Sequence, residues 1–188
     1  MEDLSQIILD LAQNSLGANA KKIEIYIEIS YLNDLLKVMI KDDGHGMDEE
    51  TVEKCTSPFY TTRKTRSVGL GLSLTKMLCE QSDGYFKISS KKGQGTTLDF
   101  AFKISHWDRP PVGKLEDTYL ALIILNPQCE IILSLISDLN TNVNAFVINS
   151  KEIKENIGDG NFSDPWVVNW LKEYLQENIY HHIKEELK

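Results

Sequence analysis

The sequence predicts an α+β fold: a two-layer sandwich with helices on one face of a mostly antiparallel sheet, followed by a small αβ unit. Ile23, Ile25, Ile27 and Ile29 alternate with other residues, which is the period of a strand with one buried face. Segments with apolar residues at helical spacing stand before and after this strand. Strand and helix periodicities in the same stretch of sequence indicate an α+β domain.

The first element is a helix that starts after Asp3 and stops at Gly17. Asp3 and Gln6 have the spacing of a capping box, and apolar residues recur at helical intervals between the two ends. The elements that follow are expected in the order strand 23–29, strand 36–40, helix 48–55, helix 69–84, strand 85–90 and strand 96–104.

A boundary is expected at residues 106–116, because the Pro110-Pro111 pair continues neither a strand nor a helix. It divides the chain into residues 1–105 and 116–188. About 75 residues are marginal for independent folding, so the second part should dock onto the first or onto a second copy. Its expected elements are strand 119–125, helix 127–139, strand 144–148, loop 156–163 and a helix that starts at Asp164-Pro165, with an apolar stripe of Val167, Trp170, Leu171, Tyr174, Leu175, Ile179 and Ile183.

The composition predicts a soluble, cytoplasmic protein. Of 188 residues 41% are hydrophobic, no apolar run approaches the ~18 residues of a membrane span, and the acidic N-terminus is unlike a secretory signal. Three widely spaced cysteines suggest neither a disulfide framework nor a zinc site. The net charge of -8 argues against nucleic acid as a partner, because its phosphates are bound by clustered Lys and Arg.

Two polar segments predict the adenine and metal sides of a nucleotide pocket. Asp10 and Asn14 are four residues apart and so share one helix face. Mg²⁺ prefers oxygen ligands, and the Asn14 carbonyl is the predicted metal ligand. The turn Asp42-Asp43-Gly44-His45-Gly46 sets a carboxylate at a strand end, where it can accept the adenine amino hydrogens while glycines let the backbone approach the base.

The phosphates are expected at Gly69-Leu70-Gly71-Leu72, where a loop becomes a helix. Unpaired N–H groups and the helix dipole attract phosphate oxygens at such a point. The preceding loop, residues 58–68, is the expected lid, and Arg63 and Lys64 rank ahead of Arg66 as the cations that meet the γ-phosphate. Each pattern is common by itself, and it is their order that favours an ATP site.

Residues 4–102 resemble the ATP-binding fold shared by gyrase, the ninety-kilodalton heat-shock chaperones, mismatch-repair ATPases and sensor histidine kinases, the GHKL or Bergerat fold. Residues 57–64 with residues 69–76 are most similar to the histidine-kinase catalytic domain. Residues 14–25 are more similar to the mismatch-repair branch. The resemblance covers about half the chain and implies that ATP and Mg²⁺ are its ligands.

The resemblance also assigns roles to single residues. It implies that Asp42 reads adenine, that Gly46 makes room for the base and that Met47 packs near it. Asp10 stands where hydrolysing relatives carry a Glu that activates water, so Asp10 is a candidate catalytic residue. Lys64 of the expected lid, which would meet the γ-phosphate, is the other candidate. The implied nucleotide-binding set is Asn14, Asp42, Gly44, Gly46, Met47, Arg63, Gly69, Leu70, Gly71, Leu72 and Thr96.

A sensor histidine kinase carries its acceptor histidine ahead of the catalytic domain, whereas nine residues precede Asp10 here. We therefore expect no acceptor module in this chain and no acceptor among His45, His106, His181 and His182. The favoured function is transfer of the ATP γ-phosphoryl group to a separate protein in two-component signalling. A nucleotide-switched interaction module with slow hydrolysis is the alternative, a mismatch-repair or gyrase-like ATPase ranks third, and a homodimer is left open.

Overall fold

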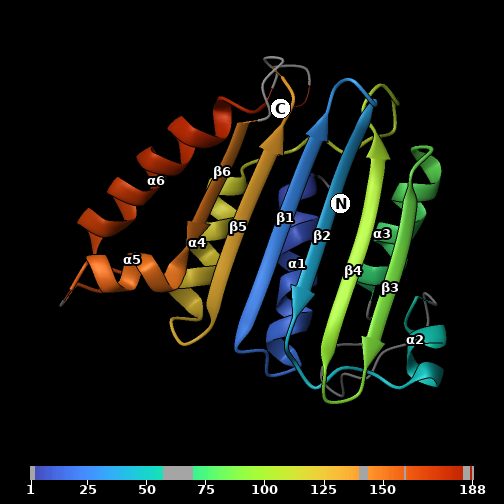
Figure 1. Cartoon of the computed structure of the whole chain (residues 1–188), viewed down its shortest axis with the longest axis horizontal. Coiled ribbons are helices and arrows are strands. Elements are labelled where there is room, and N and C mark those ends of the chain that lie inside the picture. Colours follow the sequence, from blue (N-terminus) through green and yellow to red (C-terminus); the bar gives the residue numbers. More distant parts are fainter. Residues whose placement is uncertain (1–2, 57–69, 140–143, 159, 184–186, 188) are drawn as a thin grey trace.

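A computed structural model describes residues 3–56, 70–139, 144–158, 160–183 and 187 (Figure 1). One six-stranded sheet has the order β3-β4-β2-β1-β5-β6. Its strands are β1 Lys22–Ser30, β2 Leu35–Asp42, β3 Tyr85–Lys91, β4 Gly95–Lys103, β5 Glu130–Ser137 and β6 Asn144–Asn149. The helices are α1 Leu4–Gly17, α2 Glu49–Cys55, α3 Leu70–Gln81, α4 Leu115–Leu125, α5 Ser150–Asn156 and α6 Pro165–Tyr180.

The fold-class prediction is confirmed. The helices α1, α3 and α4 lie on one face of the sheet (Figure 1), and all strand pairs except β1 with β5 are antiparallel. The predicted cap of the first helix is also confirmed, because the Asp3 carboxylate accepts the Gln6 backbone N–H at 2.9 Å. All four isoleucines of the alternating strand are buried against the helices.

The register of the central strands brings three chain segments together at one end of the sheet. Asp42, the last residue of β2, lies opposite Ile23 on β1 and opposite Thr96 on β4. The β3–β4 turn therefore lies beside the turn that follows β2. The polar face of α1 ends near the same place, since Ser15 of that helix contacts Asp42.

Two sequence predictions beyond residue 116 are wrong. Residues 119–125 belong to α4 and are not a strand, and β5 occupies most of residues 127–139, where a helix was expected. The helix α4 is apolar almost all round because it packs between α1, α6 and the sheet. A helix buried on most sides has lost the polar face that reveals its period, and short apolar runs are then ambiguous.

The second half of the chain extends the sheet of the first half. Strand β5 pairs in parallel with β1, and β6 pairs with β5. A backbone hydrogen bond of 2.8 Å from Val112 N–H to the Leu187 carbonyl attaches the C-terminal segment to the residues before α4. The boundary at residues 106–116 stays a prediction, but core side chains are continuous across it. No helix in the described residues has the length and apolar content to cross a bilayer.

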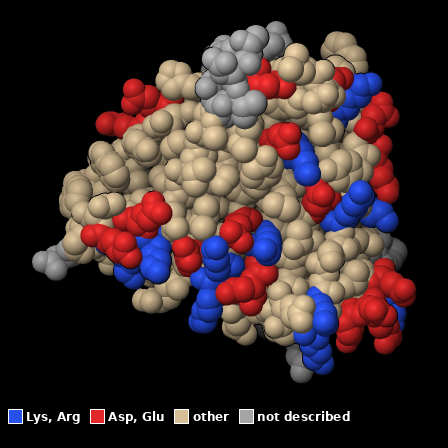
Figure 2. All heavy atoms as spheres, in the orientation of Figure 1, with Lys and Arg blue, Asp and Glu red and all other residues tan. Residues whose placement is uncertain are grey.

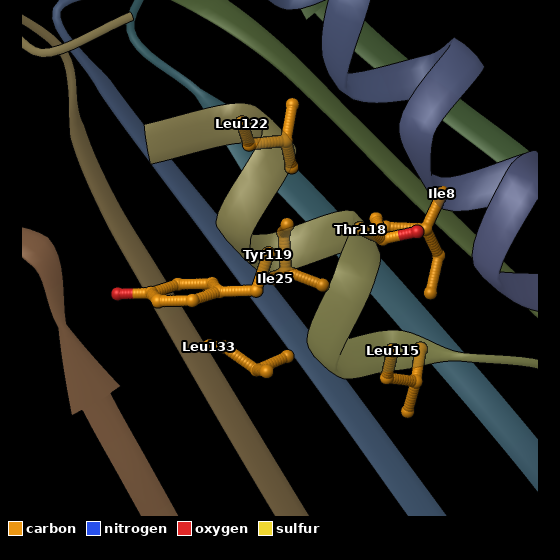
Figure 3. A pocket seen from close by; sticks show the side chains of 7 residues that line it. All are labelled: Ile8, Ile25, Leu115, Thr118, Tyr119, Leu122 and Leu133. Carbon is orange, nitrogen blue, oxygen red and sulfur yellow. The ribbon is translucent and has the colours of Figure 1, made fainter. Parts of the chain in front are cut away.

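Helix α6 starts at Pro165, as predicted, and its stripe is only partly buried. Val167, Leu171, Leu175 and Ile179 are buried, whereas Trp170 and Tyr174 are 48% and 39% exposed. Under α4 a small apolar cavity remains (Figure 3). Its lining of Ile8, Ile25, Leu115, Thr118, Tyr119, Leu122 and Leu133 carries no charged group, so this cavity is a packing defect of the core and does not suit a nucleotide.

Candidate functional site

Asp42 is the best-defined polar residue of the site. Its side chain is buried, with 7% of the residue exposed. One carboxylate oxygen accepts the backbone N–H groups of Gly44 at 2.9 Å and Thr96 at 3.2 Å, and the other accepts the Ser15 hydroxyl at 2.7 Å. A carboxylate has about four lone-pair positions, so these three donors leave one acceptor position, on the oxygen that faces Ser15.

The turn after Asp42 requires glycine. Gly46 has φ +64°, and a Cβ on it would lie 2.1 Å from the Lys91 carbonyl oxygen. The turn is held on both sides, because the His45 N–H donates to the Ala18 carbonyl at 3.0 Å and the Gly93 N–H donates to the His45 carbonyl at 2.7 Å. A Cβ on Gly44 would lie 2.9 Å from the Ala18 Cβ. The backbone therefore passes tightly between α1 and the β3–β4 turn.

Ser90 connects the other residues of the adenine side. Its hydroxyl accepts the Met47 N–H at 2.8 Å, and it lies 2.9 Å from both the Thr96 hydroxyl and the Gly95 carbonyl oxygen. Sequence reasoning assigned roles to Met47 and Thr96 but missed Ser90. The strand register would have revealed it, because Ser90 on β3 lies directly opposite Thr96 on β4.

Ser15 and Asp43 were also missed as supports of the site. Ser15 follows the predicted metal ligand and its hydroxyl donates to Asp42, so one turn of α1 carries residues of both predicted sides of the site. The Asp43 carboxylate accepts the backbone N–H groups of Lys21 at 2.7 Å and Lys22 at 2.9 Å. Asp43 thereby ties the start of β1 to the end of β2, which keeps the position of Asp42 fixed.

The predicted phosphate side lies between α1 and the start of α3. Asp10 and Asn14 are exposed on α1. A Cβ on Gly71 would lie 3.9 Å from Asn14 Nδ2 and 3.9 Å from the Asp10 Cβ. The first turn of α3 therefore passes close to the polar face of α1, and glycine at position 71 keeps a side chain out of the space between them. Leu72 packs against the core, and Leu70 is the first residue of the helix.

Several predicted residues lie outside the described part of the chain. These are Arg63 and Lys64 of the expected lid, and Gly69 just before α3. Their roles stay predictions. Within the described residues no cluster of three or more His, Cys, Asp or Glu side chains could hold a metal ion.

A family model described as "Histidine kinase-, DNA gyrase B-, and HSP90-like ATPase" matches residues 1–106. The chain belongs to this family. The predicted GHKL resemblance is thus confirmed, and the match contains the described residues of the candidate site. Binding of ATP is a property of this domain family.

Curated relatives point to the kinase branch. A putative sensor protein from Shewanella frigidimarina is 33% identical over 109 residues, which are 57% of this chain and 17% of that protein. Sporulation kinase E from Bacillus subtilis is 29% identical over 102 residues, 54% of this chain and 14% of that protein. Each match therefore spans less than a fifth of the relative's own length.

Among solved structures, the N-terminal domain of a DNA repair protein aligns with a TM-score of 0.51 at 18% identity. It covers 78% of this chain and 51% of that chain. This alignment covers more of the present chain than the match to the sensor protein does, 78% against 57%. The likeness in fold therefore extends into the second half of the chain. At this identity the likeness concerns the fold alone.

Proposed function

We propose that this chain binds ATP with Mg²⁺ and transfers the γ-phosphoryl group to a separate protein. The observation that carries the ATP site is the Asp42 carboxylate, which is buried and fixed by donors from α1, the glycine turn and β4. A buried carboxylate is costly unless it is hydrogen-bonded, and this one keeps an acceptor position in reserve. The family membership and the kinase relatives support the same proposal.

The remaining acceptor position of Asp42 suits the amino group of adenine. The adenine amino group carries two hydrogens that it can donate, whereas guanine has a carbonyl oxygen at the same ring position. If a carbonyl oxygen faced the Asp42 carboxylate, two hydrogen-bond acceptors would lie next to each other with no hydrogen between them, and they would repel. The site should therefore bind ATP in preference to GTP.

We place the phosphates between α1 and the start of α3. The first turn of a helix carries backbone N–H groups without helical partners, and the glycine at position 71 of α3 allows close approach. Asn14 would hold Mg²⁺ through its side-chain carbonyl, with Asp10 one helical turn away. Bound Mg²⁺ would neutralise phosphate charge, while the residues of this chain position the nucleotide.

The position of His182 argues against it as an acceptor within the same chain. The Tyr31 hydroxyl donates to the His182 carbonyl at 3.4 Å, so His182 lies at the β1–β2 turn. Asp42 lies at the opposite end of β2, and a strand of eight residues spans roughly 24 Å. Phosphoryl transfer requires the acceptor atom in line with the γ-phosphate at about 3 Å. Transfer to His182 of the same chain would need a large rearrangement.

The experiment that tests this proposal uses γ-labelled ATP. The purified chain is incubated with labelled ATP and Mg²⁺, alone and together with a native protein extract, and the proteins are separated. We expect label on an extract protein beyond the label that the extract acquires alone, and much less of this added label when Asp42→Asn replaces the wild type. Label released only as inorganic phosphate would contradict transfer and favour the nucleotide-switched module with slow hydrolysis.

Asp10→Asn is expected to leave ATP affinity nearly unchanged and to slow any hydrolysis by roughly 10²-fold, the usual contribution of a general base. The substitution keeps the shape of the exposed side chain and removes its basic oxygen. Phosphate release is the measurement. Asp10→Glu is the matched variant, because it keeps a carboxylate and should retain activity. Equal turnover in Asp10→Asn would assign Asp10 to metal binding or structure.

Ser15→Ala is expected to weaken ATP binding by about tenfold, because the variant loses one hydrogen bond to a charged group. Calorimetric titration measures the affinity. Ser5→Ala is the matched control: Ser5 is also buried on α1 and donates to a carboxylate, that of Asp3, at 2.6 Å. The control should lower the melting temperature and leave ATP affinity unchanged. Equal affinity losses in both variants would show that Ser15 acts through stability alone.

A further inference from the structure

The two edges of the sheet are protected differently. Strand β3 carries Lys87 and Lys91, and α2 lies against it. Strand β6 reads Asn-Ala-Phe-Val-Ile-Asn, with no charge and no proline, and its register with β5 runs from Asn144 to Asn149 without a bulge. Natural sheets blunt free edges with such charges, prolines, bulges or covering elements. In the described chain no strand pairs with the outer side of β6.

The helical layer extends farther than the sheet at this edge. Helix α6 packs against α4 and lies beyond β6 (Figure 1). Its buried residues face α4, while Trp166 and Trp170 are 58% and 48% exposed. Trp170 stacks on Tyr174 with ring centroids 5.7 Å apart, and Tyr174 contacts Phe146 of β6 at 6.0 Å. We call Trp166, Trp170 and Tyr174 the aromatic ridge. It begins at the edge strand and continues along the outer face of α6.

The surface around this edge is uncharged on the sheet side and acidic on the helix side. Figure 2 shows a largely uncharged surface over the upper parts of β5 and β6, whereas charged side chains lie at their lower ends and toward β4 and β3. On β6 the side chains of Ala145 and Val147 are exposed. On α6, Glu173 and Glu177 are exposed beside the aromatic ridge and form no ion pair with the described residues.

We propose that this edge binds an extended peptide segment of another protein, which pairs with β6 as a seventh strand and covers the aromatic ridge. The unpaired backbone of β6 supplies the hydrogen bonds of β-strand addition. The ridge supplies an apolar floor for alternate side chains of the peptide. Glu173 and Glu177 favour Lys or Arg in it, and the net charge of -8 attracts a basic segment from a distance.

A second copy of this chain fits the edge less well than a single strand. Two β6 strands paired across a two-fold axis would lie about 4.8 Å apart. Each would bring its own α6 under the same pair of strands, yet packed helices need about 8–10 Å between their axes. A lone extended peptide brings no helix. A single strand can therefore lie over the aromatic ridge without the helix clash that a second copy would cause.

A selection from a random peptide library tests the proposal without ATP. The targets are the wild type, Val147→Lys, which charges the exposed face of β6, and Ser89→Lys, a matched control at an exposed position on the opposite edge strand β3. We expect the wild type and Ser89→Lys to enrich peptides in which aliphatic residues alternate and at least one Lys or Arg is present. A synthetic enriched peptide should bind Val147→Lys about tenfold more weakly.

Further measurements decide how the peptide is bound. Its binding should slow hydrogen exchange at residues 145–148, and the double variant Glu173→Gln, Glu177→Gln should bind it more weakly and with less dependence on salt. Trp170→Ala should also weaken binding, which provides a second variant if Val147→Lys melts early. Acidic or helical peptides, or equal binding by Val147→Lys, would overturn the proposal. So would a wild-type dimer that Val147→Lys dissociates, because a second copy would then occupy the edge.

Discussion

Asp42→Asn is expected to weaken ATP binding by about 100-fold. The substitution replaces one carboxylate oxygen by an amide group that donates. Either Ser15 and the adenine amino group, or the Gly44 and Thr96 N–H groups, then face a donor in place of an acceptor. Hydrogen bonds to a charged group contribute roughly 1.5–3 kcal/mol each, and 1.4 kcal/mol corresponds to tenfold in affinity. Titration calorimetry with ATP and Mg²⁺ measures the change.

Asp43→Asn is the matched control for this prediction. Asp43 is the next residue, carries the same group and is exposed, but its carboxylate accepts backbone N–H groups at the start of β1. We expect its ATP affinity to stay within about threefold of the wild type, while its melting temperature falls because the tie between β1 and β2 is weakened. If the two variants lost affinity equally, the adenine-reading role of Asp42 would be wrong.

Gly95→Ala is expected to lower the free energy of unfolding by about 3 kcal/mol or more. Gly95 has φ +86°, and a Cβ on it would lie 1.9 Å from the Asp42 carbonyl oxygen. This contact is with backbone, so it is relieved only if β2 and β4 move apart. A loss of this size lowers the melting temperature of a chain of this length by roughly 6–12 °C. ATP affinity should fall as well, because the displaced strand carries Asp42.

Gly93→Ala separates steric exclusion from backbone strain. Gly93 lies two residues earlier in the same turn and has φ +78°, but a Cβ on it would meet nothing within 4 Å. Gly93→Ala should lower the free energy of unfolding only by the strain of alanine in the left-handed backbone conformation, about 1–2 kcal/mol. Thermal unfolding of the two variants side by side is the measurement. Equal melting temperatures in the two variants would show that the contact of the added Cβ with the Asp42 carbonyl oxygen costs no stability beyond the backbone strain.

The sequence predicted the first half of the fold well because its elements are buried on one face only. The alternation in β1 and the cap at Asp3 are local signals that the structure retains. Beyond residue 116 the local signals failed. The helix α4 is covered on nearly every side, and β5 carries apolar residues on both faces of the sheet, including Ile132 and Ile136 on the open face. Their types depend on which neighbours surround them, and periodicity does not report that.

The same distinction holds for the candidate site. Asp42 and Gly46 were predicted from the glycine pattern at a strand end, and Thr96 was implied by the family resemblance. Ser15 and Ser90 were missed because their roles arise only when α1 approaches β2 and when β3 pairs with β4. Asn14 and Asp10 were predicted from helical spacing, and the structure adds that Gly71 faces both of them.

Titration of ATP with Mg²⁺ into the wild-type chain, followed by calorimetry, tests the central claim most directly. We predict saturable heat for one site and a rise in melting temperature. A ligand at 100 times its dissociation constant adds about 2.7 kcal/mol to the free energy of unfolding. GTP should give much less heat, because the Asp42 carboxylate repels its carbonyl oxygen. The absence of binding heat at millimolar ATP, with circular dichroism showing folded protein, would contradict the account.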